Sequence, residues 1–153
     1  MKKLGIFALL LVLVSCKKEK ALPPERLVFG QFYGECAGER CIEIYKIENR
    51  KLFEDRNDQY PSFTAFYSAN YDMLSTAQYE SVKNLKNMFP MALLNESRTV
   101  IGAPDAGDWG GYYIEYEKGD MHQFWLIDKM RGSVPSAYHP FLDSVEAKIL
   151  LLK

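Results

Sequence analysis

The chain has 153 residues, of which 48% are hydrophobic and 14% aromatic, so it can form one domain with a substantial buried core. Its 19 basic and 20 acidic residues give a net charge of −1, and the lysines and arginines are spread along the sequence. Because phosphate recognition needs clustered cations, we expect no nucleic-acid partner.

The first sixteen residues have the layout of an export signal. Two lysines precede an apolar run over residues 4–14, which ends at Ser15 and Cys16. The run is shorter than the roughly 20 apolar residues that a membrane-spanning helix needs. Residues 1–15 are therefore predicted to be a cleaved signal peptide.

The end of this signal, Leu13-Val14-Ser15-Cys16, resembles the lipobox of bacterial lipoproteins. The resemblance implies that Cys16 is diacylglycerylated, becomes the first residue after cleavage and is then acylated on its amino group, for example with palmitate. Two or more acyl chains hold a protein stably in a bilayer. Membrane lipid, bound through acylated Cys16, is thus an expected partner. The alternatives are a plain secretory signal with a chance cysteine, or a start codon placed too early.

The residues after the lipobox bear on the location of the protein. The stretch Cys16-Lys17-Lys18-Glu19-Lys20 looks like the charged starts that are common among lipoproteins of the Bacteroidetes. Lys17 also differs from the Asp that retains many proteobacterial lipoproteins in the inner membrane. The resemblance implies an outer-membrane lipoprotein that faces either the periplasm or the outside, and the oligomeric state is left open.

Residues 16–26 are predicted to be a lipidated cysteine followed by a flexible tether. They are polar and then proline-rich, and Pro23 and Pro24 cannot join a sheet ladder. The chain is thus divided into a signal peptide (1–15), a tether (16–26) and a single globular domain (27–153).

The first half of the domain has the pattern of β-strands. Alternating apolar residues predict three strands, over residues 27–34, 42–47 and 51–54. If Cys16 carries the lipid, Cys36 and Cys41 are the two remaining cysteines. Because an exported chain leaves the reducing cytosol, a disulfide between Cys36 and Cys41 is predicted. A redox or metal pair and a pair of free thiols are the alternatives.

Residues 55–74 show no clean period and are rich in aromatic side chains. They either fold back to cover the sheet or form a recognition surface, since a tyrosine offers a flat apolar body with a polar tip. Covering is the expected role, because exposure of many aromatic side chains favours aggregation. Tyr67 and Tyr71 are the candidate ligand-binding residues of this segment.

Two helices and a hairpin follow. Ser75 and Gln78 have the spacing of a capping box, and apolar residues then recur at helical spacing as far as residue 89. A β-hairpin is predicted over residues 112–127 and a second helix over residues 138–149. The order of elements predicts an α+β fold, with an antiparallel sheet of four to five strands and two helices packed on one face.

The loop over residues 104–111 surrounds Trp109 with glycines, which makes Trp109 the third candidate ligand-binding residue. Asp105 and Asp108 in the same loop raise the alternative of a calcium site. No EF-hand or tandem repeat accompanies them, so no metal is expected.

No catalytic residue and no cofactor are predicted. No nucleophile with a base and no paired carboxylates have diagnostic spacing, and His122 and His139 are isolated in the sequence. The chain is interpreted as a non-catalytic binding or accessory module of the cell envelope, with an envelope protein or a glycan as partner. The alternatives are an inhibitor or immunity-type lipoprotein that blocks a toxin or hydrolase, and a small hydrolase with an unrecognised site.

Overall fold

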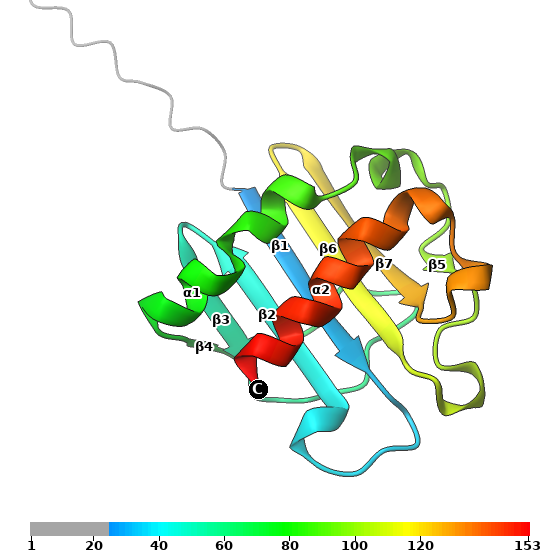
Figure 1. The fold of residues 1–153 in the computed structure, drawn as a ribbon, viewed down its shortest axis with the longest axis horizontal. Helices are drawn as coiled ribbons and strands as arrows, with labels where there is room; N and C mark the ends of the chain where they lie inside the picture. The colour runs from blue at the N-terminus through cyan, green and yellow to red at the C-terminus, as the bar shows by residue number, and fades with distance from the viewer. Residues whose placement is uncertain (1–24) are drawn as a thin grey trace, which may run out of the picture.

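The computed structural model describes residues 25–153. The predicted signal peptide, the predicted lipidation site Cys16 and most of the predicted tether lie outside the described residues. Over the described range, the chain forms one open sheet of seven strands and two α-helices (Figure 1). The predicted α+β class is confirmed, whereas the predicted number of four to five strands is wrong.

The sheet is almost entirely antiparallel. Its strands are β1 (Glu25–Phe32), β2 (Ile42–Glu48), β3 (Lys51–Asp55), β4 (Tyr71–Met73), β5 (Val100–Ile101), β6 (Gly111–Lys118) and β7 (Met121–Asp128). They lie in the order β4-β3-β2-β1-β6-β7-β5, so β1 occupies the middle. The short strand β5 runs parallel to β7, and all other neighbours are antiparallel.

The sequence pattern missed β4 and β5, the two edge strands. β4 has three residues and β5 has two, so neither is long enough to show an alternation of apolar and polar side chains. Their existence depends on pairing with a longer neighbour, as when Phe53 of β3 lies opposite Met73, or Leu126 of β7 opposite Val100. Short edge strands also limit pairing with other chains.

The two helices, α1 (Thr76–Val82) and α2 (His139–Leu152), lie over the same face of the sheet (Figure 1). The predicted capping box starts α1, because the Ser75 hydroxyl accepts from the Gln78 amide and the Gln78 side chain accepts from the Ser75 amide. α1 is shorter than predicted, since the chain continues as a 3-10 helix over Lys83–Met88. None of the helices in the described part of the chain has the length and apolar character to cross a membrane.

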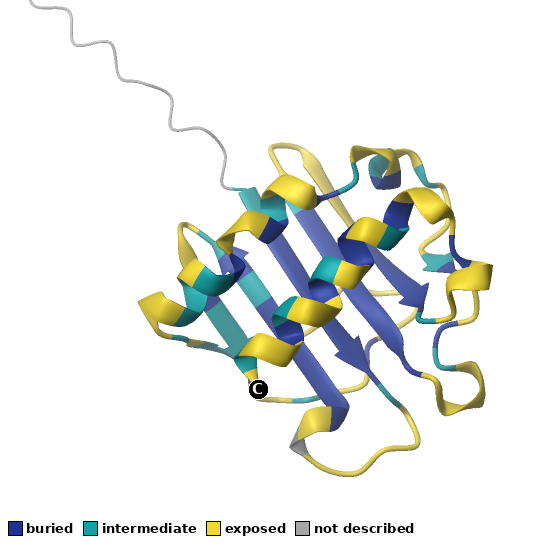
Figure 2. Cartoon of the chain, in the orientation of Figure 1, coloured by how far each residue is buried: buried dark blue, intermediate teal, exposed yellow. Residues whose placement is uncertain are grey.

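Most residues of the central strands are buried (Figure 2), and their side chains form a core on each face of the sheet. Toward the helices, Leu27 and Phe29 of β1 join a core with Phe141 of α2. Away from the helices, Val28 and Phe32 belong to a second, smaller core. β1 is therefore apolar on both sides, as expected for the central strand of a covered sheet.

The second face is covered by the connection between β3 and β4. The Tyr67 amide donates a hydrogen bond to the Tyr113 hydroxyl at 3.0 Å, and the Tyr67 hydroxyl donates to Asp55 at 2.7 Å. The Phe66 ring packs on Phe124, with ring centroids 5.0 Å apart. The aromatic-rich segment thus covers part of this face.

We name the two ends of the sheet by the parts of the chain that lie there. At the first, which we call the tether end, β1 begins at Glu25 and pairs with Lys118, next to the turn between β6 and β7. At the second, the loop end, β1 finishes at Phe32 opposite Gly111, next to the connections that precede β2 and β6. β1 starts two residues earlier than the sequence pattern indicated. Glu25 and Arg26 are both polar, so they do not extend the alternation of apolar and polar residues from which the strand was predicted.

Candidate functional site

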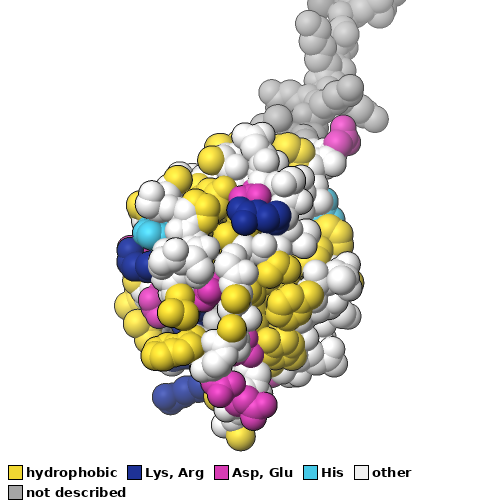
Figure 3. Space-filling model, turned by 90° about the vertical axis from the view of Figure 1, so that its right-hand side faces the viewer, with side chains coloured by type: hydrophobic (Ala, Val, Ile, Leu, Met, Phe, Trp, Pro, Cys, Tyr) yellow, Lys and Arg dark blue, Asp and Glu magenta, His cyan; other side chains and the backbone are white. Residues whose placement is uncertain are grey.

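Three aromatic side chains are exposed at the loop end, and we call them the aromatic surface: Tyr60, Phe63 and Trp109. Their exposed fractions are 43%, 39% and 65%. The rings of Tyr60 and Phe63 are stacked with their centroids 6.4 Å apart, and the Phe32 and Tyr60 rings lie edge to face with centroids 5.1 Å apart. Figure 3, which views the molecule from its β5 side, shows further hydrophobic side chains exposed among polar ones. Exposed aromatic groups in one region are typical of contact sites.

One carboxylate holds the loops of the aromatic surface together. Asp105 Oδ2 accepts hydrogen bonds from the Tyr60 hydroxyl at 2.9 Å and from the Gly34 amide at 2.8 Å. Its other oxygen accepts from the Gly110 amide at 3.1 Å. Both oxygens are therefore hydrogen-bonded within the protein, and their contacts join three loops.

The loop that carries Trp109 is also fixed by its own backbone. The Asp105 amide donates to the Gly110 carbonyl at 2.8 Å, which closes the loop around Trp109. Gly110 has a φ of +75°, and a Cβ at this position would lie 2.4 Å from the Tyr33 ring. Only glycine combines this conformation with so close an approach. Trp109 is thus exposed on a loop that is held in place.

The aromatic surface is uncharged at neutral pH. Partial burial and the hydrogen bond to Asp105 raise the pKa of Tyr60 to about 12. The Tyr60 hydroxyl therefore stays protonated and acts as a donor. The surface offers flat apolar faces with one polar tip, which suits stacking contacts more than ion pairing.

The other two predicted ligand-binding residues are not among the three exposed aromatic side chains of this surface, although the Tyr67 hydroxyl accepts from the Gln59 amide, next to Tyr60, at 3.1 Å. Tyr67 is half-buried over the second core, with its ring 5.6 Å from Tyr113. Tyr71 lies in β4 with the Lys46 amine 4.4 Å from its ring centre. Of the three predicted residues, Trp109 is exposed, whereas Tyr67 and Tyr71 are only partly exposed and have partners within the protein.

Sequence reasoning missed Tyr60 and Phe63. Their segment was recognised as rich in aromatic residues, and that composition is the signal that could have found them. It could not distinguish outward-facing rings from covering ones, because the segment has no period. The position of the Tyr60 ring is determined by contacts with Phe32 and Asp105, which are distant in the sequence.

The predicted cysteine pair also lies at the loop end. The sulfur atoms of Cys36 and Cys41 are at disulfide distance, 2.02 Å apart. Both residues lie in the connection between β1 and β2, where the Tyr33 amide donates to the Cys41 carbonyl at 3.0 Å. The pair therefore closes a loop beside the aromatic surface and is not part of a strand.

A cluster of ionisable groups lies near the tether end, on the face away from the helices. The Glu115 carboxylate accepts from the Arg26 guanidinium at 2.7 Å and from the Tyr113 hydroxyl at 2.6 Å, and lies 2.9 Å from His122 Nε2. The Phe66 ring stacks on the His122 ring at 3.9 Å. Since these groups use one another as partners, the cluster resembles a structural ion network more than a catalytic site.

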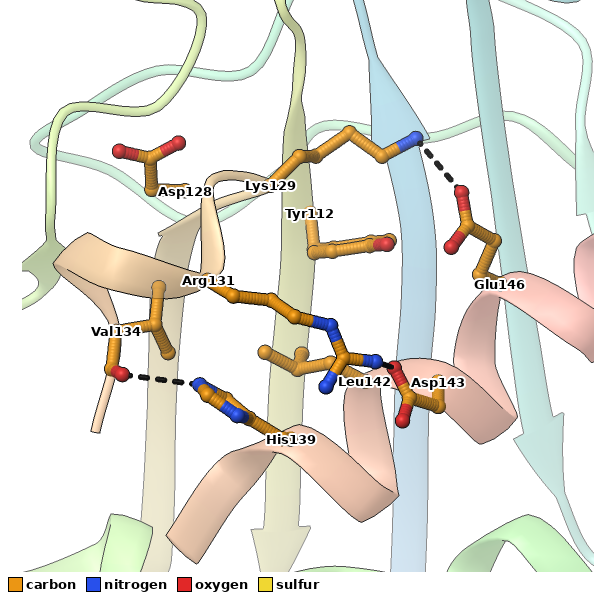
Figure 4. Close-up of a pocket in the computed structure, with 9 residues that line it drawn as sticks. All are labelled: Tyr112, Asp128, Lys129, Arg131, Val134, His139, Leu142, Asp143 and Glu146. Carbon is orange, nitrogen blue, oxygen red and sulfur yellow. Dashed lines mark hydrogen bonds and ion pairs between the residues drawn. The ribbon is translucent and has the colours of Figure 1, made fainter. Parts of the chain in front are cut away.

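A pocket between the end of β7 and α2 encloses about 50 Å³ (Figure 4). In Figure 4, Lys129 points to Glu146 and Arg131 points to Asp143. His139 contacts the Val134 carbonyl at 3.0 Å. The charges are thus paired within the wall, and the volume is far below the roughly 300 Å³ of a small-molecule site.

A larger hollow of the described residues, about 480 Å³, lies beside β3 and β4 and has several acidic residues in its wall. Asp55 accepts from the Tyr67 hydroxyl and the Asn70 amide, and Arg56 is paired with Asp72. Within residues 25–153, no group of three or more histidine, cysteine or carboxylate side chains is arranged to hold a metal ion. The aromatic surface is therefore the candidate that we consider for function.

Comparisons of the sequence with known protein families and with curated proteins find no match.

Proposed function

We propose that the protein is a lipid-anchored module of the bacterial outer membrane that binds an envelope partner, a protein or a glycan, without catalysis. The lipobox-like sequence at Cys16 supports the anchor. The observation that carries the binding role is Trp109, a side chain with 65% of its surface exposed on a loop that Asp105 and Gly110 hold in place.

A fixed exposed tryptophan favours binding for a physical reason. Association costs conformational entropy when loops become ordered, and a loop that is already ordered avoids that cost. Tryptophan and tyrosine also supply large contact areas with few rotatable bonds. Tyr60 is hydrogen-bonded to Asp105 of the Trp109 loop, and Phe63 stacks on Tyr60, so two further exposed rings lie at the same end of the sheet.

The anchor is tested first, by the intact mass of the protein purified from membranes of its host. A mass equal to the chain from Cys16 plus acyl groups supports the proposed anchor, and an unacylated mass contradicts it. Protease treatment of whole cells then distinguishes a surface-exposed domain, which is degraded, from a periplasmic one, which is protected.

The binding role is tested by crosslinking in intact cells followed by purification of the protein. We expect one partner to be enriched with the unmodified chain and lost with Trp109→Ala. Leu150→Ala is the matched control, because Leu150 is 66% exposed but lies on α2. Equal recovery of the partner with both variants would contradict a role for the aromatic surface.

A further inference from the structure

The tether end carries its own apolar surface, made of three exposed methionines, which we call the methionine face: Met88, Met91 and Met121. Their exposed fractions are 44%, 59% and 42%. Methionine is flexible and polarisable, and it adapts to irregular apolar partners. None of the three belongs to either hydrophobic core, and several exposed apolar side chains at one end of a domain are a candidate contact surface.

Contacts among the described residues place the methionine face beside the start of the domain. Met121 pairs with Lys118 across the β6–β7 turn, and Lys118 is the partner of Glu25, the first residue of β1. Met88 and Met91 flank Phe89 and Pro90 in the sequence.

Phe89 links these two methionines to the same end of the sheet. Its ring stacks on Tyr116 at 4.3 Å, and the Tyr116 hydroxyl donates to Glu25 at 2.7 Å. In Figure 1, the start of β1, the β6–β7 turn and the segment after α1 lie along the same side of the molecule.

The length of chain before Glu25 limits how far this end can be from an anchor. Eight residues, 17–24, separate Cys16 from Glu25. At about 3.3–3.6 Å per residue they span at most roughly 30 Å. A domain of this size is itself roughly 35 Å across. An anchored domain is therefore kept beside the membrane, with the start of β1 attached within roughly 30 Å of the anchor.

The charges around the methionine face are mostly paired within the protein, although Lys86 and Lys118 share one carboxylate. The Lys86 amine lies 3.1 Å from Glu25 and the Lys118 amine 3.5 Å from it. Lys83 is paired with Glu80. Because each lysine has an acidic partner and only about one unit of positive charge is left over, we infer that the contact is mainly apolar.

We propose that Met88, Met91 and Met121 rest on the headgroup region of the membrane that holds the chain's own lipid anchor. The proposal depends on the anchor of the proposed function. In this orientation Glu25, at the start of β1, lies near the bilayer and Phe32, at the end of β1, lies far from it. The aromatic surface at the loop end is then presented to partners on the side away from the membrane.

The methionines themselves provide the test. Hydrogen peroxide converts exposed methionine to its sulfoxide, and peptide mapping measures the rate at each residue. The lipidated protein is reconstituted in phosphatidylcholine vesicles and compared with the mature chain carrying Cys16→Ser in solution. Met73 and Met130, which are 62% and 54% exposed, are internal controls, because Met73 lies in the edge strand β4 and Met130 just after β7 ends at the loop end.

We expect oxidation of Met88, Met91 and Met121 to slow several-fold on vesicles, with Met73 and Met130 unchanged. Equal slowing of all five methionines, slowing of the two controls alone, or no slowing would overturn the proposal.

A pair of variants gives a second readout. Met91→Asp is expected to restore oxidation of Met88 and Met121 toward the rates in solution, because a charged group is costly in an apolar contact. Leu151→Asp, at a side chain that is 62% exposed on α2, is expected to leave the protection intact. Equal effects of the two variants would contradict this docking face.

The intact mass of the same sample separates this proposal from the proposed function. An unacylated mass removes the natural anchor but does not decide which face meets a membrane. In that case the chain from Cys16 onward is coupled at Cys16 to a maleimide phospholipid, and the oxidation experiment is repeated. The same pattern of protection supports the docking face, and its absence overturns it.

Discussion

The hydroxyl of Tyr60 donates a hydrogen bond to Asp105 at 2.9 Å, across 45 residues of sequence. This contact joins the segment that covers one face of the sheet to the loop that carries Trp109. Because Asp105 also accepts from the amides of Gly34 and Gly110, a single carboxylate fixes three connections at the loop end. The shape of the aromatic surface therefore depends on Asp105 more than on any of the aromatic residues themselves.

Replacement of Asp105 is predicted to loosen the aromatic surface and leave the sheet intact. Asp105→Asn keeps a side chain that tolerates the φ of +63° at this position but removes the charge. We expect a loss of about 1–2 kcal/mol in the free energy of unfolding, because the hydrogen bonds from Tyr60, Gly34 and Gly110 lose their charged acceptor. The measurement is urea unfolding followed by far-UV circular dichroism.

The same variant has a second, independent readout in the titration of Tyr60. Its pKa of about 12 is raised by burial and by the hydrogen bond to Asp105. With the carboxylate replaced, the pKa is expected to fall toward the ordinary value near 10. NMR of tyrosine labelled at Cζ, assigned with Tyr60→Phe, checks this. An unchanged pKa would show that Asp105 does not hold Tyr60 in solution.

Removal of the Cys36–Cys41 pair is predicted to have a small and local effect. The cysteines are five positions apart, and closing so short a loop stabilises the fold by about 2 kcal/mol in the chain-entropy description. Both lie outside the strands, so Cys36→Ser with Cys41→Ser is expected to keep the circular dichroism spectrum. A double variant that fails to fold would contradict this and would give the pair a larger structural role.

The sequence predicted the central elements of the fold well because their patterns are long. The alternation in β1 and β6 and the capping box at Ser75 are local signals, and each extends over a full element or marks its start. β4 and β5 carry too few residues for any such signal. They form because β3 and β7 offer unpaired edges, which only the assembled sheet shows.

The candidate site could be predicted only in part, for a similar reason. The glycines around Trp109 indicate an exposed turn, and the exposure of Trp109 follows from that local pattern. The positions of Tyr60, Phe63 and Tyr67 cannot be read from their own segment. Tyr67 is fixed by Asp55 and Tyr113, and Tyr60 by Asp105, so their environments come from three different parts of the chain.

Glu115 is predicted to be the most sensitive charged position on the face away from the helices. Its carboxylate is almost fully buried and accepts from Arg26 and Tyr113. Glu115→Gln removes the charge that balances Arg26, and we expect a loss of about 2–4 kcal/mol in the free energy of unfolding.

The control for this experiment is Glu80→Gln, which breaks an exposed ion pair with Lys83. Exposed pairs contribute at most about 1 kcal/mol, so this variant should be close to the unmodified protein. Urea unfolding of both variants at pH 7 measures the difference. Similar stability of the two would mean that the Glu115 network is not a net source of stability.

Asp128 is predicted to make stability depend on pH at the acid end. At the end of β7, its carboxylate accepts from the Ser133 hydroxyl at 2.6 Å, the Met130 amide at 2.8 Å and the Ala103 amide at 2.9 Å. Burial acts to raise the pKa of Asp128, but these hydrogen bonds outweigh it and lower the pKa below its usual value.

A carboxyl group whose pKa is lower in the folded state stabilises the fold most when it is ionised. Its contribution is complete above the unfolded pKa of about 4 and is lost as the pH falls through the lower, folded pKa. Asp128→Asn is therefore expected to be less stable than the unmodified protein at pH 7, by about 1–3 kcal/mol. Urea unfolding at several pH values should show this difference shrinking below about pH 4. Other carboxyl groups, such as Glu25, are present in both proteins and cancel in the comparison. A difference that stays constant down to acid pH would mean that ionised Asp128 does not hold the Ala103 and Ser133 segments together.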